Sequence, residues 1–131
     1  MPNKYAIGDV FYINEGYDPH YHIVILASVS SKEPMYLIVY LSSSKTKADM
    51  TTTFNKGEDV FIDRFCWVKY QSAYIISETD LDSGRIIRYE CKANSSIIGR
   101  ITADLPKAKL APRVVKERFA EWKSDQMFSS F

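Results

Sequence analysis

Residues 36–42 carry apolar or aromatic side chains on both faces of an extended chain, and this pattern constrains the fold more than any other segment. Leu37, Val39 and Leu41 share one face. Two tyrosines, an isoleucine and a serine share the other, so neither face is simply polar. A strand of this kind has to be covered on both sides. We expect a barrel interior on one side and a second subunit on the other.

Several other short segments have the β-branched and aromatic composition of strands. They are separated by turn residues such as those of residues 29–34 and 82–84. The expected strands are residues 9–14, 22–28, 35–42, 52–54, 66–70, 73–77 and 85–90. Residues 43–59 are the most polar and loop-like stretch.

The C-terminal third changes to a helical period. Ile97, Ile101 and Leu105 recur at i, i+4 and i+8 after two candidate capping residues, Asn94 and Ser95. A second helix is expected after Pro112, where an apolar stripe is formed by Val115, Phe119 and Trp122. The order of elements predicts a mainly β (α+β) fold, with six or seven short strands in a small barrel and one or two C-terminal helices.

Length and composition limit the classes of function. The 131 residues suit a single domain, 1–131, and the net charge of +1 gives no global attraction to nucleic acid. A local basic cluster exists, formed by Lys107, Lys109, Arg113, Lys116 and Arg118. No apolar run approaches the roughly 18 residues of a membrane span, and no secretion signal is present. We therefore expect a cytoplasmic protein without membrane attachment.

The two histidines of the chain, His20 and His22, share one face of an extended segment, and Asp18 extends the pattern to D-x-H-x-H. Three interpretations follow. The histidines can finish a strand, act in acid/base chemistry, or bind a metal. A metal site would need further ligands from distant loops, such as Asp63 or Glu90, and no CxxC motif accompanies it, so neither metal nor cofactor is expected.

GDVFYI near the N-terminus, a loop that ends in HIVILAS, and IVYLSSS followed by a polar loop together resemble motifs of the MazF/PemK family of toxin endoribonucleases. FIDRFCWVKYQSAYIIS and the turn at residues 81–84 are similar to later parts of that family, and the closest likeness is to a divergent PemK-like branch. The resemblance implies an SH3-like, MazF-like barrel that forms a homodimer. It also implies single-stranded RNA as substrate and a partner antitoxin.

The resemblance also assigns site residues. The family's loop arginine falls on His22, and its [TS]-S pair falls on Ser42 and Ser43. Cleavage by the ribose 2′-OH needs a base, an acid and a donor or cation at the phosphate. His20 and His22 then supply the base and the acid, and the serines a hydrogen bond.

Four further residues complete the predicted site. Lys45 and Lys47 supply positive charge, and Tyr17 and Tyr21 stack on unpaired bases. Because the family arginine is replaced, a non-catalytic module that binds nucleic acid or protein on the same fold stays an open alternative. A CcdB-like gyrase poison is a third reading, although the C-terminal WKSDQMFSSF does not match the ending of those toxins.

Overall fold

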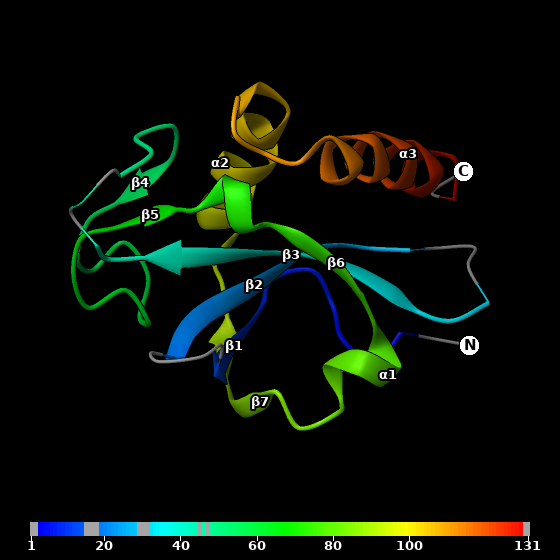
Figure 1. Cartoon of the computed structure of the whole chain (residues 1–131), viewed down its shortest axis with the longest axis horizontal. Coiled ribbons are helices and arrows are strands. Elements are labelled where there is room, and N and C mark those ends of the chain that lie inside the picture. The colour runs from blue at the N-terminus through cyan, green and yellow to red at the C-terminus, as the bar shows by residue number, and fades with distance from the viewer. Residues whose placement is uncertain (1–2, 15–18, 29–31, 45, 47, 130–131) are drawn as a thin grey trace.

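The computed structural model describes residues 3–14, 19–28, 32–44, 46 and 48–129. All seven of its strands belong to one antiparallel sheet (Figure 1). The strands are β1 (Asp9–Asn14), β2 (Pro19–Ala27), β3 (Met35–Ser42), β4 (Thr53–Phe54), β5 (Cys66–Val68), β6 (Tyr74–Ser77) and β7 (Ile86–Lys92). The helices are α1 (Glu78–Leu81), α2 (Ser95–Asp104) and α3 (Arg113–Ser129), with 3-10 turns at Tyr70–Ser72 and Leu105–Lys107. The mainly β (α+β) fold class is confirmed.

The sheet order is β4-β5-β3-β2-β1-β7, and β6 pairs separately with β3. One edge of β3 pairs with β2, and the other edge pairs with two strands, β6 and β5. The first half of β3 pairs with β6, and Leu41 and Ser42 pair with β5. Among the described strands, the sheet has two free ends, because no pairing joins β7 to β6 or to β4. Among these strands, no ladder of hydrogen bonds closes the sheet into a barrel.

Both faces of β3 are covered by side chains of the same chain. Leu37, Val39 and Leu41 belong to the larger apolar cluster, beneath α2 and α3. Tyr36 and Ile38 belong to a second cluster on the other face, which α1 helps to cover. Figure 1 shows α1 on the side of the sheet opposite to α2 and α3. The two-sided apolar pattern is therefore satisfied within one chain and does not itself require a second subunit.

The two long helices follow the periodicity of the sequence. Asn94 caps α2, since its side-chain oxygen accepts a hydrogen bond from the Ile97 N–H at 2.9 Å. Ile97 and Ile101 are buried, and each such burial contributes roughly 1.5–3 kcal/mol. Along α3 the stripe of Val115, Phe119 and Trp122 packs on the same cluster. None of the described helices has the length and apolar character to cross a membrane.

Helix α1 was not expected from the sequence, which predicts a turn at residues 82–84, just after the helix, and the structure has that turn. Ser77 starts this helix by accepting a hydrogen bond from the Asp80 N–H at 3.1 Å. Leu81 is fully buried in the second cluster, and Glu78 accepts a hydrogen bond from the Tyr36 hydroxyl at 2.6 Å. A single helical turn carries too little periodicity to be recognised, so tertiary contacts determine it.

Candidate functional site

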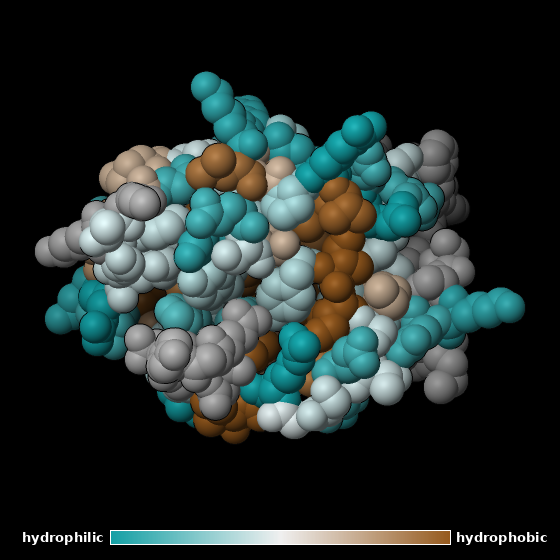
Figure 2. Space-filling model, viewed as in Figure 1, coloured by the Kyte–Doolittle hydropathy of each residue, from teal (hydrophilic) through white to brown (hydrophobic). Residues whose placement is uncertain are grey.

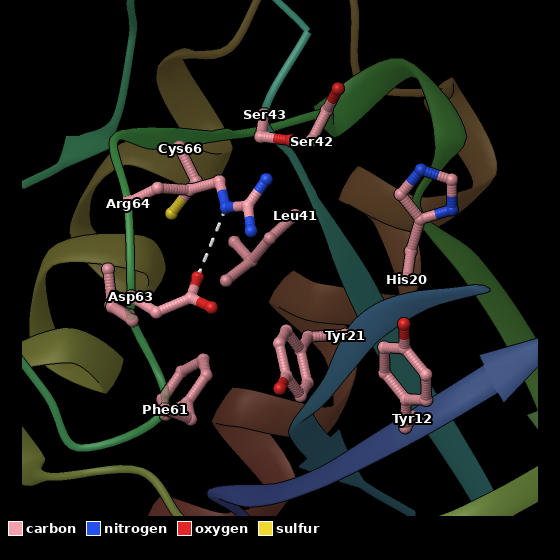
Figure 3. Close-up of a pocket in the computed structure, with 11 residues that line it drawn as sticks. Tyr12, His20, Tyr21, Leu41, Ser42, Ser43, Phe61, Asp63, Arg64 and Cys66 are labelled. Atoms are coloured by element: carbon pink, nitrogen blue, oxygen red, sulfur yellow. Dashed lines mark hydrogen bonds and ion pairs between the residues drawn. The ribbon is translucent and has the colours of Figure 1, made fainter. Parts of the chain in front are cut away.

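The residues predicted as a site fall at one end of the sheet, where β2 begins and β3 ends. A cavity of about 220 Å3 lies there, bounded by the ends of these strands and by the loop before β5. Its lining residues are Tyr12, His20, Tyr21, Leu41, Ser42, Ser43, Phe61, Ile62, Asp63, Arg64 and Cys66 (Figure 3). Four predicted residues, His20, Tyr21, Ser42 and Ser43, therefore share one cavity. Tyr17, Lys45 and Lys47 lie outside the described residues.

Three aromatic rings form one wall of the cavity. The ring centroids of Tyr12 and Tyr21, which are paired across β1 and β2, lie 5.0 Å apart. Tyr21 contacts Phe61 edge to face at 5.5 Å. Figure 3 places these rings on the side of the cavity opposite to the two serines. Burial and the carboxylate of Glu90 raise the pKa of Tyr21, so its phenol is neutral near neutral pH.

Arg64 supplies a cation that the sequence analysis missed. Its side chain lines the cavity, and its Nε donates a hydrogen bond to Asp63 Oδ1 at 3.3 Å (Figure 3). Because a guanidinium carries five N–H donors, this bond leaves others for a ligand. The side chains of this ion pair are 70% and 67% exposed, so the pair contributes little to stability. The only sequence signal for Arg64 is a charged residue in the loop before a strand.

The two histidines occupy different environments. The imidazole of His20 is half-buried, lines the cavity and contacts the edge of the Tyr40 ring at a centroid distance of 4.8 Å. His22 is 0% exposed, does not line the cavity, and has its Nδ1 2.8 Å from the Tyr74 hydroxyl. Burial, followed by the charges of His20 and Arg85, lowers the pKa of His22 to about 3. His22 is therefore neutral near neutral pH and has no access to a substrate in the cavity.

The serine pair also divides into two roles. Ser42 is 5% exposed, and its Oγ accepts a hydrogen bond from the Ser44 N–H at 3.2 Å. The Ser44 carbonyl in turn accepts from Trp67 Nε1 at 2.7 Å, so this segment is fixed against β5. Ser42 thus fixes the end of β3, whereas Ser43 is exposed and lines the cavity. Ser43 follows directly where β3 stops, as its sequence position predicts.

Cys66 lines the same cavity as a buried thiol. Burial, followed by the charges of Glu58 and Asp63, raises its pKa to about 11. The thiolate, which is the nucleophilic form, is scarce near neutral pH. Among the residues that the structure describes, no three His, Cys, Asp or Glu side chains are grouped as metal ligands. Acid/base and electrostatic chemistry by His20 and Arg64 is what this arrangement offers.

A second hollow lies beside β6, with a volume of about 540 Å3. Figure 2 shows a band of hydrophobic residues crossing the surface where Figure 1 places β6. The hollow is lined by Met35, Ser72, Tyr74, Ile75, Ile76, Ser77, Asp80 and Arg85. None of the predicted site residues that the structure describes lines this hollow.

Comparison of the chain with family models, with curated proteins and with solved structures finds no match. The likeness to MazF/PemK motifs therefore receives no support from these comparisons. The toxin function, the antitoxin and the homodimer stay predictions, and any function has to be argued from the cavity itself.

Proposed function

We propose that the cavity at the end of β2 and β3 binds single-stranded RNA, and that His20 and Arg64 cleave it without metal. The observation that carries the proposal is the composition of one cavity. Aromatic faces for bases, a guanidinium for phosphate, an imidazole and an exposed hydroxyl line the same space. Base–aromatic stacking contributes about 1–3 kcal/mol per base where it occurs.

The proposed step is transesterification. His20 accepts the proton of the ribose 2′-OH, and the 2′ oxygen forms a bond to the adjacent phosphorus. The bond from phosphorus to the 5′ oxygen breaks, and this oxygen takes a proton from water. Arg64 and the Ser43 hydroxyl donate hydrogen bonds to the phosphate oxygens while charge develops there. The products are a 2′,3′-cyclic phosphate and a 5′-OH end.

Binding without cleavage is the second candidate, and one observation favours it. A two-histidine mechanism needs a second imidazole as acid, but His22 is fully buried and its pKa is lowered to about 3. With one imidazole in place, general acid–base catalysis is limited to the part that His20 performs. This candidate predicts a complex with RNA and no product.

The test incubates the protein in EDTA with long single-stranded RNA and identifies the fragment ends. Cleavage that leaves a 2′,3′-cyclic phosphate is expected for the wild type, and its loss for His20→Gln and Arg64→Gln. Arg113→Gln is the matched control for Arg64, because Arg113 is also exposed and bonded through Nε to a carboxylate, that of Glu117. His22→Gln is expected to keep activity while it stays folded.

Intact RNA that is nevertheless retained by the wild type would favour the binding candidate. Intact RNA without retention, across several sequences, would refute both candidates. Cleavage that survives in His20→Gln would remove His20 from the mechanism.

A further inference from the structure

Among the described residues, three cations lie in or near the cavity, and they differ in how far their charge is compensated by a neighbouring carboxylate. Arg64 is bonded to Asp63, as described above. Arg88 donates from Nε to Glu90 Oε1 at 3.0 Å and lies over the ring of Tyr12 at 4.3 Å. Lys69 is the third cation. Among the residues that the structure describes, no carboxylate lies within ion-pairing distance of its ammonium.

Lys69 and His20 contact the same aromatic ring, that of Tyr40. Lys69 Nζ lies 5.6 Å from the centroid of Tyr40, whose ring also contacts the His20 imidazole at 4.8 Å. The backbone of Lys69 is fixed as well, because its N–H donates to the Tyr40 carbonyl at 3.0 Å. A cation–π contact positions an ammonium and leaves N–H donors that point away from the ring available to a ligand.

We infer that Lys69 binds a backbone phosphate of the RNA, so that the strand runs from the cavity over His20 and Tyr40 to Lys69. The inference rests on the proposed function of the cavity. The competing route leads from the cavity over Tyr12 to Arg88, along β1 and β7. The guanidinium of Arg88 is paired with Glu90 at 3.0 Å and also lies over the Tyr12 ring, so its charge is more fully compensated than that of Arg64, whose bond to Asp63 is longer and more exposed. The first route offers a positioned cation, Lys69, without a carboxylate partner among the described residues.

Salt dependence of binding tests the route. A random-sequence pool of short 2′-O-methyl RNA, which has no free 2′-OH and resists cleavage, is titrated with each protein at several salt concentrations in EDTA. For single strands, each phosphate contact contributes about 0.7 to the slope of log K against log salt. Lys69→Gln is expected to reduce the magnitude of this slope by about 0.7. Arg88→Gln is expected to leave it unchanged.

Lys123→Gln is the matched control. Lys123 also lies over an aromatic ring, with its Nζ 5.4 Å from the centroid of Phe119, but on α3. Nearby, Gln126 bonds to the carbonyl of Ala27, at the end of β2 remote from His20. An unchanged slope is expected.

The outcomes separate the two proposals. No retention of RNA by the wild type, even at low salt, overturns the proposed function and the route together. Retention with the same slope for Lys69→Gln as for the wild type overturns the route alone. A reduced slope for Arg88→Gln instead of Lys69→Gln overturns it as well, in favour of β1 and β7.

Discussion

The buried imidazole of His22 makes the stability of this protein depend on pH in a way that can be calculated. Its pKa is lowered from 6.5 to about 3, mainly by burial and then by His20 and Arg85. The unfolded chain takes up a proton near pH 6.5, whereas the folded protein does not until about pH 3. Between these values the unfolded state binds more protons, so the stability is present above pH 6.5 and falls as the pH falls toward 3.

The magnitude follows from linkage. One proton difference changes the free energy of unfolding by about 1.4 kcal/mol per pH unit. Lowering the pH from 6.5 to about 5 should therefore cost about 2 kcal/mol through His22 alone. Other groups titrate in the same range, so the quantity to compare is the difference between wild type and His22→Gln. Glutamine does not titrate and can still form a hydrogen bond with Tyr74.

The assay is urea unfolding at neutral pH and at about pH 5, with linear extrapolation of both proteins. The loss of unfolding free energy should be about 2 kcal/mol smaller in His22→Gln than in the wild type. NMR gives a second readout without mutation, because the chain has two histidines. The signals of one imidazole should stay at their neutral positions well below pH 6.5. Equal pH dependence in both proteins, or two imidazoles that titrate near neutral pH, would refute the reasoning.

Two further predictions concern hydrogen bonds that stabilise the fold. Replacing the α2 cap in Asn94→Ala should lower the free energy of unfolding by about 1 kcal/mol in a urea titration. Ser95→Ala, one residue further on and exposed, is its control and should change little. Thr52→Val removes a buried hydroxyl that lies 2.6 Å from both Asp104 Oδ2 and the Tyr70 hydroxyl. The loss should be about 1–3 kcal/mol, because buried polar partners stay unsatisfied. A thermal midpoint equal to that of the wild type would contradict this expectation.

Much of the fold could be predicted because its elements depend on local pattern. The expected strand at residues 9–14 agrees with β1 at both ends, and the expected cap Asn94 starts α2. The segments that differ are those set by distant contacts. The segment expected as a strand at residues 66–70 ends at Val68, since Tyr70 turns inward to bond Thr52. Composition alone does not reveal such a bond.

The cavity could be predicted in part for a related reason. The positions of His20 and Ser43 follow from where strands begin and end, and strand ends are readable in sequence. Arg64 and Phe61 come from an irregular loop that is distant in sequence from β2. Their approach to Tyr21 depends on how that loop returns to β5, which involves no periodic pattern. Tyr12 joins the site through its cross-strand pairing with Tyr21, which requires the register of β1 and β2.

The two histidines show that an alternating pattern predicts which face of a strand a side chain is on, but not how deeply it is buried. Period-two alternation correctly places His20 and His22 on one face of β2, because both contact the ring of Tyr40. It cannot say how far along the strand that face is covered. His22 is buried, and Tyr74 of β6 contacts its ring. His20, at the start of β2, is only half-buried. The two histidines of this pattern thus lie in different environments: the His22 imidazole is kept neutral in the interior, and the His20 imidazole lines a cavity.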